Sequence, residues 1–293
     1  MRRIFIAIAA LGIIAAGTAW VISSPRPLDS AAIAGLHGEA EAGRVVFLAA
    51  GCGSCHRGPG RDSDPLILSG GRSFASDFGT FRAPNISPDP VHGIGGWSQT
   101  DFVNAVMRGI SPEGAHYYPS FPYTSYIRAE KQDIVDLHAY MMTLPPDATP
   151  SEPHDLGFPF TIRRGVGLWK ALFLRDGWVM TGDLTQEETR GRYLFEALAH
   201  CGECHTPRNA LGALRRADWS TGAPNPSGTG RIPDIAGPQF TWTAFDVSAY
   251  LSSGLTPAFD VVGGSMADVV SNLQQLDTAE LDAIAAYVLR LRN

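Results

Sequence analysis

Cysteine is scarce in this chain of 293 residues. Four cysteines occur, and all four lie in two copies of the pattern Cys-x-x-Cys-His, so none is left over for a disulfide framework. A basic surplus is also missing, since 23 Lys and Arg stand against 29 Asp and Glu for a net charge of −6. Binding to a phosphate backbone depends on such a surplus, so nucleic acid is not an expected partner.

Long uninterrupted segments are rare as well, because 32 glycines and 21 prolines punctuate the chain. With 44% apolar and 18% charged residues, the composition is that of a folded protein with room for two domains. These features predict short helices joined by long loops.

One long apolar run does occur, Ile4–Ile22, directly behind Arg2 and Arg3. As a helix its 19 residues extend about 28 Å, close to the ~30 Å hydrocarbon core of a bilayer. We predict a transmembrane anchor rather than a cleaved signal peptide, because the nearest small-residue cleavage site, Gly17–Ala19, lies inside the run. A buried core helix is a further alternative, disfavoured because the run has no polar face. The arginines favour the cytoplasmic side, which places the chain beyond Pro25 on the periplasmic side of a bacterial inner membrane.

Segments around the two Cys-x-x-Cys-His patterns match one another, which indicates an internal duplication. Each half ends in a predicted amphipathic helix, at residues 131–143 and 278–291. The matched pairs are Gly43–Phe47 with Gly191–Phe195, Arg82–Ile86 with Arg231–Ile235, Gly96–Ser98 with Thr241–Thr243, and Gly109–Pro112 with Gly254–Pro257, the last at an offset of 145 positions. We therefore divide the chain into a membrane anchor or signal at residues 1–24, a first domain at 25–145, a linker at 146–187 and a second domain at 188–293.

The segment between the two domains changes character along its length. Residues 145–153 are rich in proline and predict an extended tether. Residues 158–175 mix aromatic side chains with four basic ones, a composition that suits a membrane surface or a partner protein. We favour instead that the aromatics pack in the groove between the two domains while the bases face water.

The pattern Cys-x-x-Cys-His has the spacing by which two thiols add to the vinyl groups of one haem while the adjacent histidine reaches its iron. Cys52, Cys55 and His56 form the first copy, and Cys201, Cys204 and His205 form the second. A four-thiolate zinc site is an alternative, but it leaves both histidines and the duplication unexplained. A dithiol redox motif expects a βαβ setting, which the flanking sequence lacks. The sequence therefore predicts two covalently bound haem c groups, with His56 and His205 as iron ligands.

Both halves resemble the class I cytochrome c fold at these and neighbouring residues. In that family a glycine of the N-terminal helix admits the close crossing of a C-terminal helix that bears an aromatic, and a proline carbonyl accepts the N–H of the iron-bound histidine. The resemblance implies Gly43, Phe47, Tyr140 and Pro84 for these roles in the first half, and Gly191, Phe195, Tyr287 and Pro233 in the second. It implies a mainly α fold of two tandem class I cytochrome c-like domains with long loops, preceded by an N-terminal transmembrane helix.

The chain is also similar, over most of its length, to diheme c-type cytochromes and to cytochrome c subunits of membrane-bound dehydrogenases of the alcohol and gluconate type. The stretches that carry this similarity are Ala83–Asp89, Gly93–Ser98, Tyr118–Tyr123 and Cys201–Asn209. The resemblance implies a role in electron transfer.

A methionine from a loop before the last helix closes the iron in class I cytochromes and raises its reduction potential. Met266, preceded by Gly-Gly-Ser, occupies that place in the second half. The offset of 145 positions leads from Met266 to Phe121, where the related dehydrogenase subunits carry methionine in a Tyr-Pro-x-Met-Pro-Tyr pattern. A phenyl ring has no lone pair to give to iron, so the first haem is expected to lack its usual ligand.

Substitute ligands for the first haem are few. His116 lies five positions before Phe121, although a loop histidine is more often simply hydrogen-bonded. The remaining candidates are Met107, Met141 and Met142 on predicted helices, where methionine usually packs in a core, and Met180 in the linker, while His92, His138 and His154 have no positional support.

Two classes of function follow from these expectations. The favoured one is an anchored periplasmic electron carrier between a dehydrogenase or quinol-oxidising complex and a downstream cytochrome or oxidase. The alternative is an enzyme whose open first haem acts on a small molecule such as peroxide or a sulfur compound. His116, Arg108 and Tyr117 are the distal acid or base candidates for that alternative.

Overall fold

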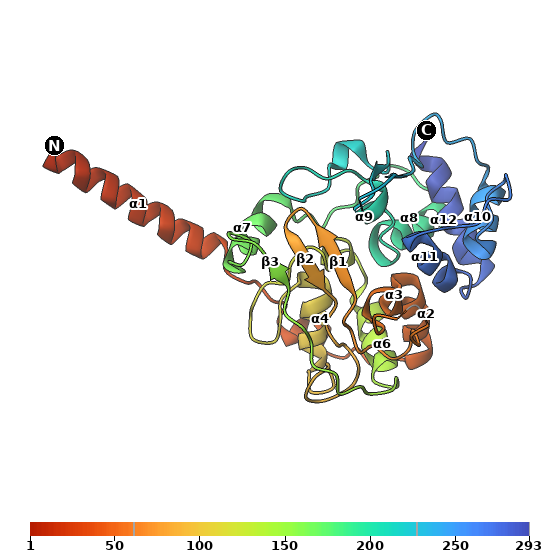
Figure 1. The fold of residues 1–293 in the computed structure, drawn as a ribbon, viewed down its shortest axis with the longest axis horizontal. Helices are drawn as coiled ribbons and strands as arrows, with labels where there is room; N and C mark the ends of the chain where they lie inside the picture. The colour runs from red at the N-terminus through yellow and green to blue at the C-terminus, as the bar shows by residue number, and fades with distance from the viewer. Residues whose placement is uncertain (61, 227, 293) are drawn as a thin grey trace.

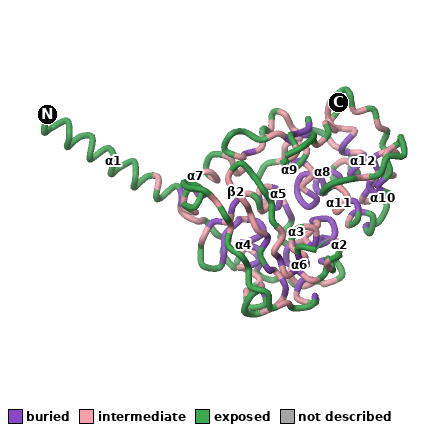
Figure 2. The backbone as a smooth tube through the Cα atoms, in the orientation of Figure 1, coloured by how far each residue is buried: buried purple, intermediate pink, exposed green. Residues whose placement is uncertain are grey.

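The N-terminal helix α1 (Arg2–Ile22) projects away from a rounded body of short helices and long loops (Figure 1). The computed structural model describes residues 1–60, 62–226 and 228–292. No residue of α1 is buried, and Figure 2 shows the helix exposed along almost its whole length. In that described part of the chain, α1 is the one helix long and apolar enough to cross a membrane.

The body is mainly helical, with two small antiparallel sheets in the order β1-β2-β3 and β4-β5. The first half, residues 25–145, holds η1 (Ser30–Ile33), α2 (Ala40–Ala50), α3 (Cys52–His56), β1 (Ser73–Ser76), β2 (Gly79–Arg82), α4 (Gln99–Arg108), α5 (Tyr123–Tyr126) and α6 (Lys131–Met141). The linker holds β3 (Asp155–Leu156) and α7 (Arg164–Phe173). The remainder holds α8 (Gln186–Tyr193), η2 (Leu194–Leu198), α9 (Gly202–His205), η3 (Arg216–Asp218), β4 (Ala223–Pro224), β5 (Arg231–Ile232), α10 (Ala244–Ser253), α11 (Ser265–Leu273) and α12 (Thr278–Leu291). The strands form inside segments that the sequence predicts as loops.

A pair of crossed helices forms the core of each half, α2 with α6 and α8 with α12. A Cβ atom added to Gly43 would lie 1.9 Å from the backbone oxygen of Asp136, so only glycine fits where α2 meets α6. Aromatic pairs close the two crossings, Phe47 with Tyr140 at 5.3 Å between ring centroids and Phe195 with Tyr287 at 5.4 Å.

The same crossing recurs in the second half, residues 188–293. A Cβ atom added to Gly191 would lie 1.9 Å from the backbone oxygen of Ala283. The second half has one more residue than the first between the core phenylalanine and the first cysteine, which are Phe195 and Cys201 here. The extra residue is absorbed in a π-helical turn, η2, which continues α8.

Helices α4 and α10 begin and end in the same way. Ser98 and Thr243 each accept from the backbone N–H three residues later, and the Asp at that position accepts from the capping residue in return. Gly109 and Gly254 end the helices in the left-handed conformation that suits glycine at this position.

The loops after α4 and α10 keep the offset of 145 positions. An isolated β-bridge joins Ile110 to His116 in the first loop, and another joins Leu255 to Val261 in the second. Because the bridges have the same register, Phe121 and Met266 follow them at equivalent positions.

The linker lies against the first half and does not form the extended tether that its prolines predict. Strand β3 pairs antiparallel with β2, with Leu156 opposite Gly79. The buried amide of Asn85 donates to the carbonyl oxygens of Asp147 and Thr149, each at 2.8 Å. These bonds fix the path of the linker, which its proline-rich sequence alone does not determine.

The second part of the linker departs from the prediction that its bases face water. Arg164 and Lys170 donate hydrogen bonds to backbone carbonyls of other segments. Trp169 and Phe173 line a pocket between the two halves, as predicted, whereas Phe158 is 83% exposed.

Candidate functional site

The first Cys-x-x-Cys-His segment forms α3, a single helical turn that follows a left-handed Gly51. Both thiols are free, Cys55 exposed and Cys52 partly so. The Nδ1–H of His56 donates to the carbonyl oxygen of Pro84 at 2.9 Å. That bond holds the proton on Nδ1 and leaves the lone pair of Nε2 available to a metal ion.

The second segment repeats this geometry on α9. The Nδ1–H of His205 donates to the carbonyl oxygen of Pro233, again at 2.9 Å. The thiols of Cys201 and Cys204 are free, and Cys204 is exposed. The proline contact that the class I resemblance implies is therefore present in both halves.

Backbone bonds hold both histidines at the same place relative to their prolines. The N–H of Gly70 donates to the carbonyl oxygen of His56 at 2.7 Å, and the N–H of Gly222 donates to that of His205 at 2.7 Å. Both glycines have positive φ values, +75° and +81°. Because glycine has no Cβ, the backbone at these two positions can lie directly against the segments that contain Pro84 and Pro233. Burial lowers the pKa of His56 and of His205, which favours the neutral imidazole that a metal ligand requires.

The zinc and dithiol alternatives lose support in this arrangement. Across the described residues, no three His, Cys, Asp or Glu side chains gather into a metal site, so the four thiols do not form one. The two segments are short helices between loops, without the βαβ setting of a thioredoxin-like motif.

The two segments lie at the junction of the halves, and each contacts the other half. Ser54, between the first two cysteines, accepts from the amide of Asn272 on α11 at 2.7 Å. Glu203 occupies the same position in the second segment and accepts from the hydroxyls of Thr124 and Ser125 on α5. Each Cys-x-x-Cys-His segment is therefore bonded to a helix of the opposite half.

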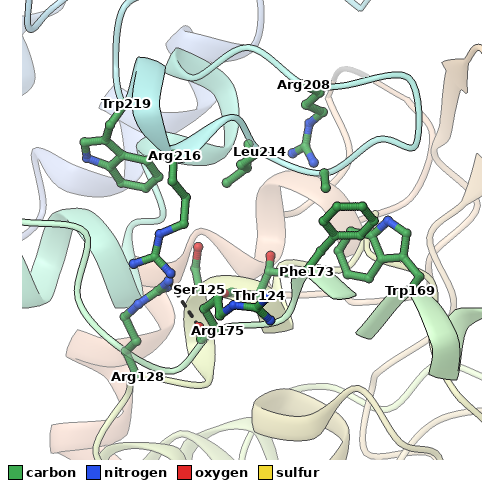
Figure 3. A pocket seen from close by; sticks show the side chains of 11 residues that line it. Thr124, Ser125, Arg128, Trp169, Phe173, Arg175, Arg208, Leu214, Arg216 and Trp219 are labelled. Carbon is green, nitrogen blue, oxygen red and sulfur yellow. Dashed lines mark hydrogen bonds between the residues drawn. The ribbon is translucent and has the colours of Figure 1, made fainter. Parts of the chain in front are cut away.

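Figure 3 shows the junction beside the second segment, where a small pocket opens. Thr124 and Ser125 of α5 line it together with Trp169 and Phe173 of α7, and Arg208 lies across from them. Arg208 also donates to the carboxylate of Glu203 at 2.6 Å. The linker helix α7 is thus part of the contact between the halves.

Met266 lies in the first turn of α11, which starts after Gly264 at a φ of +59°. The sequence predicts a loop at Gly263–Met266, whereas the structure places Ser265 and Met266 in the helix. The Met266 side chain is partly buried against the hydrophobic core. Two residues on, Asp268 pairs with Arg57 at 3.0 Å and Arg72 at 3.2 Å, both from the first half.

Phe121, at the equivalent position of the first half, lies in a cluster of aromatic rings. The ring centroids of Tyr117, Tyr123 and Tyr126 are 6.1, 6.4 and 6.0 Å from its own. The ring is partly buried and packs against the core. No atom of this side chain can ligate iron, and the missing sixth ligand of the first haem stays a prediction.

His116 uses both ring nitrogens within the protein. Its Nε2–H donates to the carbonyl oxygen of Ser23 at 2.9 Å, and its Nδ1 lies 3.2 Å from the ammonium of Lys170. The side chain is buried, and burial lowers its pKa. His116 therefore fits a hydrogen-bonded, structural role better than the role of an iron ligand.

The other candidates lie in structural positions. Met107 and Met141 are buried in α4 and α6, Met142 and Met180 are partly buried against the core, His92 is exposed, His138 stacks on Phe102, and the Nδ1 of His154 accepts from the backbone N–H of Arg82.

Asp268, Asn272 and Glu203 are absent from the set of residues that the sequence predicts, although they bond the two halves to each other beside the two segments. Their nearness in sequence to Met266 or to a cysteine is the one signal that points to them. Their partners lie 78 to 218 positions away, a separation that no local pattern reveals.

Comparison with known proteins decides the family. Residues 40–145 match the cytochrome c family. A diheme cytochrome c-type protein of Cereibacter sphaeroides is 51% identical over 292 residues, which cover 99% of each chain. The chain belongs to the cytochrome c family. Membership implies covalently bound haem c, so this cytochrome needs the thiol pairs that its sequence retains.

Two further relatives of this cytochrome are subunits of dehydrogenases. The fructose dehydrogenase cytochrome subunit of Gluconobacter japonicus is 39% identical over 254 residues, 84% of this chain and 51% of that subunit. The cytochrome c subunit of the quinone alcohol dehydrogenase of Gluconacetobacter polyoxogenes is 32% identical over 262 residues, 85% of this chain and 55% of the subunit. The chain thus spans about half the length of each subunit. The similarity to dehydrogenase cytochrome subunits that the sequence predicts is confirmed.

Proposed function

We propose that the chain is a diheme electron carrier built from two tandem class I cytochrome c domains, residues 25–145 and 188–293. Cys52 and Cys55 would hold haem 1 as thioethers with His56 on its iron, and Cys201, Cys204 and His205 would hold haem 2 in the same way. The observation that carries the proposal is the repeated histidine-to-proline bond, 2.9 Å in both halves, beside two free thiols.

The residues present fit the group. Each segment offers two thiols at the spacing of the haem vinyl groups and one neutral imidazole whose Nε2 is not committed to Pro84 or Pro233. Haem c supplies a reversible one-electron couple at its iron. The protein contributes the orientation of the imidazole, through the proline carbonyl.

The sixth ligand distinguishes the two sites. Met266 would give its sulfur to haem 2, because it follows the same bridge and loop that place Phe121 in the first half. Haem 1 would have no protein sulfur at this position.

The contacts across the junction support transfer of electrons between the two haems. Ser54 and Glu203 lie inside the two Cys-x-x-Cys-His segments, and each is bonded to the opposite half. Because both segments line the junction, the attached groups would lie close together inside one chain. Electrons would enter from a dehydrogenase or a quinol-oxidising complex and leave to a cytochrome or an oxidase, consistent with the names of the dehydrogenase subunits that the chain resembles.

We also place the body on the periplasmic side of the bacterial inner membrane, anchored by residues 4–22. In support, α1 is exposed all round, and two arginines precede its apolar run. The alternative function, an enzyme acting at haem 1, is weaker because His116 already uses both ring nitrogens.

Intact-mass measurement of the denatured protein tests the proposal. Two complete segments should add the mass of two haems to the polypeptide. The matched variants Cys55→Ala and Cys204→Ala should each weaken covalent attachment at one site and leave the other unchanged. Addition of one haem to the unmodified chain, or of zinc, would contradict the proposal. The same mass also reports whether α1 is retained.

A further inference from the structure

The end of α1 is fixed to the linker by a set of contacts to one arginine. Arg164 donates through Nη2 to the carbonyl oxygen of Trp20 at 2.7 Å and through Nε to the hydroxyl of Ser23 at 2.9 Å. Its guanidinium lies over the Trp20 ring, 4.2 Å from the centroid. The helix α7 therefore starts at the point where α1 joins the body, as Figure 1 shows.

One side of the linker segment 158–173 is committed to the body. The Lys170 ammonium donates to the carbonyl oxygens of Arg108 and Gly109 at 2.7 and 2.8 Å, where it caps the C-terminus of α4. The indole N–H of Trp169 donates to the carbonyl oxygen of Leu211 at 2.8 Å. These bonds hold the second part of the segment against the body.

The same segment also exposes large apolar side chains. Its large side chains are Phe158 at 83% exposed, Phe160 at 40%, Ile162 at 52%, Leu168 at 37% and Leu172 at 60%. Five large apolar side chains are thus exposed within fifteen residues, a concentration that a monomer in water rarely presents without a partner. We call this set the linker patch.

We propose that the linker patch inserts into the boundary between headgroups and acyl chains of the bilayer that α1 crosses. The inference rests on the proposed anchoring of α1. The segment that carries the patch contacts the end of α1, an apolar helix with no buried residue (Figures 1 and 2). The bilayer that surrounds α1 would therefore also reach the patch. Aromatic and aliphatic side chains beside arginine are the composition that such a boundary favours.

The consequence is a two-point attachment to the membrane. With α1 alone in the bilayer, the body would tilt and rotate together with the helix to which Arg164 fixes it. With the linker patch also inserted, the side of the first half that carries His116 and α7 faces the membrane, and α10, α11 and α12 of the second half face away from it (Figure 1).

Photocrosslinking in lipid tests this placement on the full-length holoprotein. The amino acid p-benzoylphenylalanine is placed singly at Phe158 or Leu172 and, as a matched control, at Phe245, which is 80% exposed in the second half. A fourth variant at Ile13 reports the anchor itself. The proteins are reconstituted in vesicles of phosphatidylethanolamine and phosphatidylglycerol, irradiated, and analysed by intact mass for added lipid.

Lipid adducts at Phe158 and Leu172, at least tenfold above those at Phe245 and comparable to those at Ile13, are the expected result. Adducts at Ile13 with none at Phe158 or Leu172 would overturn the inference while leaving the anchor intact. A covalent dimer at these positions in place of lipid would assign the patch to a second copy of the chain and would also overturn it. Absence of adducts at Ile13 would contradict the anchor of the proposed function instead.

Discussion

The two halves of the chain agree where the Cys-x-x-Cys-His segments lie and differ where a sixth ligand is expected. The histidine-to-proline bond is 2.9 Å in both, and the glycine N–H that donates to the histidine carbonyl lies 2.7 Å away in both. In contrast, Phe121 is followed by the four-residue helix α5, whereas Met266 lies in the first turn of the nine-residue helix α11. Backbone hydrogen bonds therefore keep the histidine side of each site the same, while the side chain at the position of the sixth ligand differs between the halves.

The variable helices also carry the contacts between the halves. Asp268 on α11 stands at the position of Tyr123 on α5, and it pairs with Arg57 and Arg72 of the other half. Tyr123 is fully buried instead, beneath the ammonium of Lys170 at 4.4 Å. Helices α5 and α11 thus contact different neighbours. This difference explains how the positions of Tyr123 and Asp268 diverged without changing the helix pairs that the two halves share.

The largest effect is expected from Met266→Ala. Loss of the thioether sulfur should lower the potential of haem 2 by a sizeable part of the roughly 0.8 V that axial ligation spans, because the thioether stabilises the ferrous state. The sulfur-to-iron charge-transfer band should disappear. Potentiometric titration with optical detection measures both, and an unaltered spectrum would assign Met266 to the core.

The next effect, of opposite sign, is expected from Phe121→Met. A sulfur at this position should raise the potential of haem 1 and move its spectrum towards that of haem 2, which would remove the difference between the halves. Phe121→Leu is the matched control, since it has no lone pair and a similar apolar volume. If both variants behave alike, the equivalence of Phe121 and Met266 is wrong.

A smaller effect is expected from Asp268→Asn, which breaks two partly buried ion pairs between the halves. We expect a loss of about 1–2 kcal/mol in the free energy of unfolding. The charge-transfer band of haem 2 should fade at a lower temperature than in the unmodified protein. Glu280→Gln, which breaks an ion pair of 2.7 Å with Arg190 away from both segments, serves as the control. Equal behaviour of the band in both variants would remove any positioning role for Asp268.

The smallest effect concerns pH and the linker. Removal from water lowers the pKa of Lys170 to about 7, below the roughly 10.4 of a lysine in an unfolded chain. Between these two values the unfolded chain binds more protons, so stability should rise with pH across this window. Lys170→Met should flatten that rise, as measured by denaturant unfolding at pH 7 and 9. An equally steep rise in the variant would show that Lys170 does not titrate there.

Most of the repeated frame could be predicted from the sequence, because it depends on residues close together in each half. Thr278–Leu291 forms α12 as predicted, and α6 ends at Met141, two residues before the predicted end. Gly43 and Gly191 occupy the helix crossings that the resemblance implies.

The linker could not be predicted in the same way. Its tether-like composition describes the free chain, but Asn85 and strand β2 fix it to the first half through contacts some 60 or more positions away. Arg164 and Lys170 have basic side chains that normally face water, and they are partly buried here because backbone carbonyls at two helix ends accept hydrogen bonds from them. Such partners become visible only in three dimensions.

Carbon monoxide binding to the fully reduced protein, followed during a potentiometric titration, tests the inequivalence of the two haems most directly. The account predicts two separate midpoints and one carbon monoxide per chain, bound at the haem of lower potential, because Phe121 gives haem 1 no sulfur while Met266 closes haem 2. Two identical histidine–methionine spectra without carbon monoxide binding would contradict it and would require a methionine elsewhere, such as Met107 or Met180, to reach haem 1.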